Sequence, residues 1–258
     1  MGVPELVTFG ESMGLLLTEP ARPLRGAAGF ARSIAGAESN VAVGLSRLGH
    51  PSGWFGRVGD DAFGLGILDA LRREGVDVDR ARVDPEAPTG LLIRDRHPQR
   101  RIQVLYYRHG SAGSRLGPGD VDEGYIAGAR VLHVTGITPA LSDSCLEGVR
   151  AAMDGARRRG VTVCFDPNLR LRLWSAQRAA ATIEPLLASA DIVLTGDGET
   201  EKLSGRGGTM NSQTGEVTWD NEYILLENRN FIPERNYLLP IPQSERDVNP
   251  NMTQNDGY

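Results

Sequence analysis

Residues 131–166 read VLHVTGITPALSDSCLEGVRAAMDGARRRGVTVCFD. The segment opens with VLHVTG and closes with VTVCFD, two short apolar runs that are typical of buried strands. Between them, SDSCLEGVRAAMDGARRRG has the length and pattern of a helix. A strand, a helix and a second strand at this spacing predict parallel strands joined by a right-handed crossover.

The same alternation extends to both sides of this segment. SAQRAAATIEPLLASA at 175–190 predicts a helix and DIVLT at 191–195 a strand, while LVTFG at 6–10 predicts a strand near the N-terminus. Two further helices are expected, one from Ser39 to Gly49 and one that follows Asp60-Asp61 and ends at Gly75. Their predicted buried positions are Val41, Leu45 and Leu48 in the first, and Phe63, Ile67, Leu68 and Leu71 in the second.

Residues 89–107 follow a different pattern. TGLLIRD and RIQVLYYR are β-rich runs separated by the polar turn DRHPQ. This arrangement predicts an antiparallel hairpin rather than a parallel crossover. The fold class is therefore α/β: a parallel sheet flanked by helices, with a small antiparallel unit. Ligands of such sheets bind beyond the carboxyl ends of the strands.

Composition excludes several function classes. The 258 residues carry a net charge of −5 and are 40% hydrophobic, which is ordinary for a globular protein and gives no electrostatic reason to expect nucleic acid. Two cysteines and four scattered histidines predict neither a disulfide framework nor a zinc site. There is no P-loop and no G-x-S-x-G elbow. With no membrane-length apolar run and no secretory signal, we expect a cytoplasmic protein that binds no membrane.

Residue usage changes abruptly near the glycine-rich stretch at 205–208. Residues 1–208 contain 24 alanines and residues 209–258 none, whereas the eight asparagines of 209–258 contrast with two before them. The last 50 residues also carry the whole net charge of −5. The change is consistent with a polar C-terminal extension or with two unrelated pieces in one chain. We therefore expect two units, 1–208 and 209–258.

Three stretches could carry chemistry. Residues 36–40, GAESN, stand where a loop enters a helix, and their alternative interpretation is a plain N-cap. Tyr106-Tyr107-Arg108 ends the predicted hairpin, where an arginine could hold a carboxylate or be a surface cation. DPNLR at 166–170 follows a strand and could be a functional loop or only a turn.

Together these stretches resemble the PfkB, or ribokinase-like, sugar kinases, and most closely the 2-keto-3-deoxygluconate kinase branch. The similarity is carried by GAESNVAVGLSRLG, FGRVGDDAFG, VLYYRHGSAGS, HVTGITPALS and DPNLRLRLW, in this order, within residues 3–206. The resemblance implies a ribokinase-like sheet with a small β lid, whose strands lie near 11–18 and 89–107. It also implies an ATP-dependent kinase acting on a small-molecule sugar acid, and a homo-oligomer is possible.

The resemblance also implies roles for individual residues. Those expected to bind the sugar are Gly36, Ala37 and Asn40, and those expected to hold its acid group are Tyr106, Arg108 and Arg170. Two guanidinium groups suit a carboxylate-bearing ligand. Glu199 resembles the acidic residue that positions Mg²⁺ through water, although the asparagine that the family has three residues earlier is Gly196 here.

The catalytic motif of these kinases, G-A-G-D, is not found in the sequence. In the family its amides cradle the transferred phosphate and its aspartate is the base. Gly59-Asp60-Asp61 resembles it superficially, but we interpret Asp61 as a helix cap. No catalytic residue is therefore assigned, ATP and Mg²⁺ binding by this chain is in question, and we expect little or no phosphoryl transfer.

The final 31 residues, 228–258, resemble the extreme C-terminus of SusD/RagB glycan-binding proteins. Four prolines limit regular structure there, so we expect a mostly irregular tail. We also expect the parallel sheet to end after DIVLT with an exposed edge. Alternatives to an impaired kinase are a sugar-acid-binding fragment, a chimera with no function as a unit and, less favoured, a SusD-type glycan-binding protein.

Overall fold

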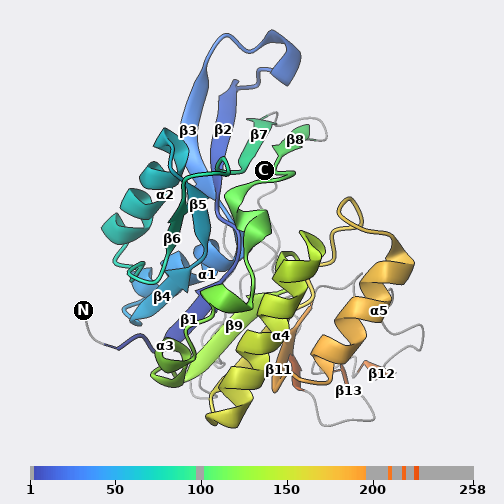
Figure 1. Ribbon diagram of the computed structural model, residues 1–258. Helices are drawn as coiled ribbons and strands as arrows, with labels where there is room; N and C mark the ends of the chain where they lie inside the picture. Colours follow the sequence, from blue (N-terminus) through green and yellow to red (C-terminus); the bar gives the residue numbers. More distant parts are fainter. Residues whose placement is uncertain (1–2, 97–101, 196–208, 211–216, 219–223, 227–258) are drawn as a thin grey trace, which may run out of the picture.

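A computed structural model describes residues 3–96, 102–195, 209–210, 217–218 and 224–226 (Figure 1). Its main element is a six-stranded sheet in the order β14-β11-β10-β9-β1-β4, in which all neighbours run parallel. The strands are β1 (Leu6–Phe9), β4 (Ser52–Phe55), β9 (Val131–Thr135), β10 (Thr162–Asp166), β11 (Ile192–Leu194) and β14 (Ile224–Leu226). The predicted α/β class and parallel order are confirmed.

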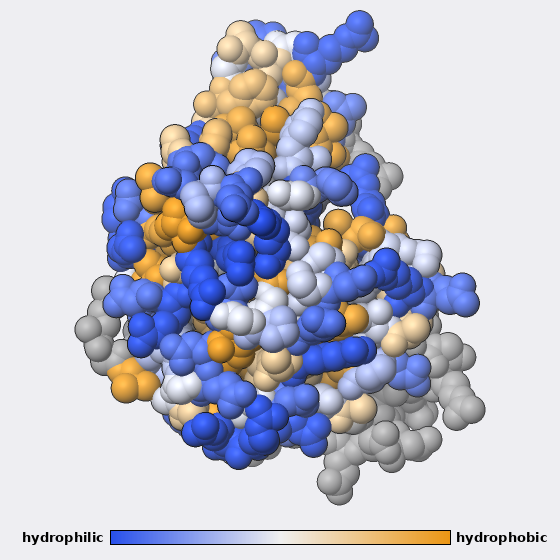
Figure 2. Space-filling view, viewed as in Figure 1, coloured by the Kyte–Doolittle hydropathy of each residue, from blue (hydrophilic) through white to orange (hydrophobic). Residues whose placement is uncertain are grey.

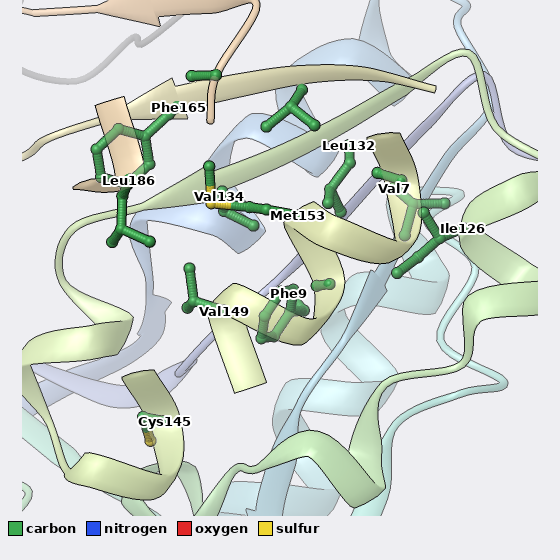
Figure 3. Close-up of a cluster of buried hydrophobic side chains, with 14 of the residues drawn as sticks. Val7, Phe9, Ile126, Leu132, Val134, Cys145, Val149, Met153, Phe165 and Leu186 are labelled. Carbon is green, nitrogen blue, oxygen red and sulfur yellow. The ribbon is translucent and has the colours of Figure 1, made fainter. Parts of the chain in front are cut away.

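Helices cover both faces of this sheet. They are α1 (Ala37–Arg47), α2 (Ala62–Arg73), α3 (Glu123–Ala127), α4 (Asp143–Arg158) and α5 (Ala176–Leu187). Side chains alternate across a strand, so neighbouring residues of β1 enter different clusters. Val7 packs with residues of α4 in the large core drawn in Figure 3, whereas Leu6 packs against Val41 of α1.

A four-stranded sheet projects from the main body (Figure 1). Its order is β3-β2-β7-β8, with β2 (Met13–Pro20), β3 (Phe30–Ala35), β7 (Leu91–Arg96) and β8 (Val104–Tyr107). The predicted hairpin is β7 and β8, which pair antiparallel with Leu92 opposite Tyr106. We call this unit the lid sheet. Apolar residues give the orange upper region of Figure 2, where the lid sheet lies. Four large side chains of its strands are exposed: Phe30, Leu105, Tyr106 and Tyr107.

Shorter elements complete the described chain. They are β5 (Arg57–Gly59) and β6 (Arg82–Asp84), which pair with each other, and the 3₁₀ turns η1 (Leu24–Gly26), η2 (Ala112–Arg115), η3 (Pro118–Asp120) and η4 (Thr138–Ala140). No helix in the described ranges combines the length and the apolar character that crossing a bilayer requires.

The first two helices agree with expectation except in detail. Helix α1 begins at Ala37, two residues before Ser39, and ends at Arg47. Leu48 is its C-cap and is 57% exposed, so its predicted burial is wrong: the chain leaves the helix before this side chain can face the sheet. Phe63, at the start of α2, is only partly buried. Asp61 caps α2 as predicted, accepting hydrogen bonds from the Phe63 and Gly64 amides.

The expected open edge after β11 is not present. Residues Ile224–Leu226 form β14, which pairs parallel with Ile192–Leu194. The backbone groups at the edge of β11, for which the sequence pattern indicates no partner, therefore pair with a later segment of the chain. Two other short strands of the 209–258 unit, β12 (Thr209–Met210) and β13 (Val217–Thr218), pair antiparallel. The remaining residues of that unit lie outside the described ranges.

Candidate functional site

The candidate site lies where the lid sheet joins the carboxyl edge of the parallel sheet. Strand β1 ends at Phe9, and β2 of the lid sheet starts at Met13, so only residues 10–12 separate the two sheets. The neighbouring strands β9 and β10 end at Thr135 and Asp166, at the same edge. This edge is where open α/β sheets bind ligands.

The first turn of α1 packs closely on the segment that follows β1. Gly36 is its N-cap, and a Cβ there would lie 2.8 Å from the carbonyl oxygen of Glu11. The Ser39 and Ser12 hydroxyls are 3.1 Å apart. Of the three residues expected to bind sugar, Gly36 is buried, Ala37 is partly buried and Asn40 is exposed. All three belong to one helical turn.

Glu38, in the same turn, is a buried carboxyl that the sequence pattern does not single out. Its Oε1 accepts hydrogen bonds from Thr135 Oγ1 and Thr138 Oγ1, both at 2.7 Å. Burial raises the pKa of Glu38, and the two threonine hydrogen bonds oppose that rise. Gly10 lies against it, since a Cβ at Gly10 would be 2.4 Å from Glu38 Cδ. The carboxyl thus ties α1 to the end of β9.

Arg108, directly after β8, is the charged group of the lid sheet that reaches this edge. Its Nη2 forms an ion pair with Oε2 of Glu11, although the two groups are not aligned as a hydrogen bond. The Arg108 side chain is 11% exposed and that of Glu11 is fully buried. The Arg108 guanidinium carbon lies 5.8 Å from the centre of the Tyr106 ring. Tyr106 and Arg108 are therefore brought together as expected, but the partner Glu11 was not foreseen.

The loop after β10 is a tight turn. Asp166 Oδ1 accepts a hydrogen bond from the Asn168 amide at 2.9 Å, and Asn168 has a positive φ of 38°. Asparagine tolerates this conformation better than most residues. Arg170 follows with an exposed side chain, on a different loop from Arg108 but at the same edge of the sheet.

The structure assigns no residues to Mg²⁺. Glu199 lies outside the described ranges. Within those ranges, no three His, Cys, Asp or Glu side chains are grouped so that they could hold a metal ion.

Comparison with known proteins identifies relatives for most of the chain. The model of the pfkB family of carbohydrate kinases matches residues 4–219. The 2-dehydro-3-deoxygluconokinases of Bacillus subtilis strain 168 and Thermoproteus tenax are 43% and 42% identical over 203 and 204 residues, each 78% of this chain. The crystal structure of a PfkB protein from Polaromonas sp. JS666 superposes with a TM-score of 0.76 at 40% identity, covering 79% of this chain and 69% of that one.

The chain matches only part of the length of each relative. The chain spans 63% and 62% of the lengths of the two curated kinases. A second family model, the SusD family, matches residues 193–258 and overlaps the first over 193–219. The two family matches thus meet in the region where residue usage changes.

Proposed function

The chain belongs to the pfkB family of carbohydrate kinases, and on this basis we propose that it binds a sugar acid of the 2-keto-3-deoxygluconate type. The ligand would lie between the first turn of α1 and the end of β8. We further propose that these 258 residues transfer phosphate poorly or not at all.

The observation that carries the choice of ligand is the position of Arg108. A guanidinium group beside an aromatic ring, at the root of the lid sheet, suits a small ligand with one carboxylate and several hydroxyls. Gly36 lets the first turn of α1 pack directly on the Glu11–Ser12 segment, because a Cβ there would lie 2.8 Å from the Glu11 carbonyl oxygen. Arg170 would supply a second cation from the loop after β10. The similarity to two 2-dehydro-3-deoxygluconokinases supports the same choice.

The proposed lack of turnover rests on the sequence that follows β11. No G-A-G-D segment occurs there, and Asp61, in the segment that most resembles it, caps α2. A positioned general base contributes roughly 10²- to 10⁴-fold to a reaction rate. An anion site adds a further factor of about 10² to 10³. ATP and Mg²⁺ are what the family resemblance implies, and we propose that this chain uses them inefficiently.

Titration calorimetry tests the binding claim. The unaltered chain is titrated with 2-keto-3-deoxygluconate and with fructose, a neutral ketose without the acid group, and Arg108→Leu serves as the variant. We expect the acid to bind at least about tenfold more tightly than fructose, as one charge-assisted contact implies, and the variant to lose that preference. Equal affinities in the unaltered chain would refute the choice of ligand.

A coupled assay of ADP release tests the second claim. The chain is mixed with ATP, Mg²⁺ and 2-keto-3-deoxygluconate, and a full-length kinase of the family is the positive control. Turnover within the range of about 1–100 s⁻¹ that is usual for kinases would show that the proposal of inactivity is wrong.

A further inference from the structure

The buried carboxylate of Glu11 is the charged group that the proposed function leaves unexplained. It lies two residues beyond β1 and is fully buried. Its Oε1 accepts a hydrogen bond from Ser111 Oγ, and its Oε2 is the partner of Arg108 Nη2. Ser111 in turn caps η2, where its hydroxyl accepts from the Ser114 amide. One carboxylate therefore holds both sides of the bend that follows β8.

The surroundings of Glu11 fix its position. A Cβ at Gly113 would lie 2.4 Å from Glu11 Cγ, and a Cβ at Gly90 would lie 2.6 Å from Glu11 Oε1. Real side-chain carbons do not approach other atoms this closely, so any larger residue at either glycine would displace the carboxylate. Gly90 directly precedes β7, and Gly113 lies within η2. Glu11 is thus packed from the lid side as well as from the sheet side.

Arg108 is only partly satisfied by this contact. Its Nε is buried and has no hydrogen-bond partner in the described part of the chain. A buried guanidinium N–H without a partner is costly unless something accepts from it. The Arg108 charge also reaches Glu38, whose pKa it lowers slightly against the larger effect of burial. The guanidinium is therefore held by one carboxylate and retains an unused donor.

We propose that Glu11 is a positioning residue for the proposed ligand site: it holds the Arg108 side chain in the orientation in which the guanidinium group binds the carboxylate of a sugar acid. A free arginine side chain has many rotamers, and ordering them on binding costs free energy. Glu11 orders the side chain before the ligand arrives. The inference rests on the proposed function for the identity of the ligand, but the hold on Arg108 can be tested without any ligand.

The first measurement is hydrogen exchange of the Arg108 Nε–H by NMR. Arg108→Lys assigns the signal, because that variant lacks it. In the unaltered chain we expect a slowly exchanging signal, and in Glu11→Gln, which keeps the shape but not the charge, exchange at least about tenfold faster. The matched control is Glu86→Gln, since Glu86 pairs with Arg115 on the surface and is 74% exposed. Unchanged exchange in Glu11→Gln would overturn the proposal.

The second measurement compares affinities for 2-keto-3-deoxygluconate and fructose. If Glu11 positions Arg108, Glu11→Gln lowers the affinity for the acid by about tenfold or more and that for fructose much less. A purely structural role would lower both by the same factor, and competition between Glu11 and the ligand would raise the affinity for the acid. Either result would overturn the proposal. If the unaltered chain binds neither sugar, the proposed function fails, while the exchange measurement still decides whether Glu11 holds Arg108.

Discussion

Replacing Asp61 by alanine should destabilise the protein without acting through catalysis. Asp61 Oδ1 accepts from the Phe63 and Gly64 amides at 2.9 and 2.8 Å, and Oδ2 accepts from the Thr89 amide at 2.8 Å. The carboxylate therefore caps α2 and also holds the backbone at Thr89, two residues before β7 begins. Loss of the cap costs about 1 kcal/mol. Loss of the charge-assisted bond to Thr89 adds about 1.5–3 kcal/mol.

The sum predicts a fall of roughly 2.5–4 kcal/mol in the free energy of unfolding, measured by urea titration. At about 2–4 °C per kcal/mol for a chain of this size, Tm falls by about 5–15 °C. Asp61→Asn, which keeps the Oδ1 acceptor, should lose only part of this. Asp69→Ala is the matched control, because Asp69 is exposed on the same helix and its ion pair is with Arg72. If Asp61→Ala changed stability no more than Asp69→Ala, the reasoning would be refuted.

Acid sensitivity follows from the same hydrogen bonds. They hold the pKa of Asp61 below its usual value, against the opposing effect of burial. In the window between the folded and the unfolded pKa, the unfolded chain binds more protons than the folded chain. The stabilisation is therefore complete above the unfolded value near 3.8 and is lost as pH falls through the folded value. Asp61→Ala should therefore weaken the dependence of the free energy of unfolding on pH in this acid range, as measured by urea titration at successive pH values.

Other measurements probe the core, the ligand site and the sheet edge. Burial lowers the pKa of His133 from 6.5 to about 4. The free energy of unfolding should therefore fall by up to about 3 kcal/mol as pH drops from 6.5 to 4. Urea titrations at successive pH values measure this change, and His133→Gln should remove it. Gly36→Ala should weaken 2-keto-3-deoxygluconate binding about tenfold or more in calorimetry, because its Cβ would press on the Glu11 carbonyl, whereas Gly119→Ala, in open space, should not. A chain ending at residue 208 would lack β14 and expose the β11 edge, and light scattering should then show association; a monodisperse product with an unchanged Tm would contradict the role given to β14.

Local patterns predicted the parts of the fold that local chemistry determines. Helix α4 follows from the length and pattern of SDSCLEGVRAAMDGARRRG, and the β7–β8 hairpin follows from β-rich runs on either side of a polar turn. Strand β3 was not anticipated, because its residues are largely exposed and its strand character comes from pairing with β2. The pairing of β14 was missed because it, too, depends on a partner strand that is distant in the sequence.

The charged centre of the candidate site could not be predicted from local sequence. Glu38 meets Thr135 and Thr138, which are 97 and 100 positions away, and Glu11 meets Ser111 at a separation of 100. In a linear pattern each of these glutamates resembles an ordinary polar residue next to glycine or alanine. Only the folded chain shows that both are buried. An acidic residue within a stretch of small residues, as in GAESN, is the sequence signal that could have drawn attention to Glu38.

The order of strands in the main sheet has a consequence for synthesis on the ribosome. Strand β1 lies between β4 and β9, yet β9 is made only after residue 130. At roughly 5–20 residues per second, the nascent chain carries β1 and β4 for several seconds before the second neighbour of β1 emerges. During that interval the side of β1 that later pairs with β9 has no strand partner, and an unpaired strand edge invites pairing with other chains. Translation speed across residues 56–135 should therefore govern how much of the newly made chain reaches the native state.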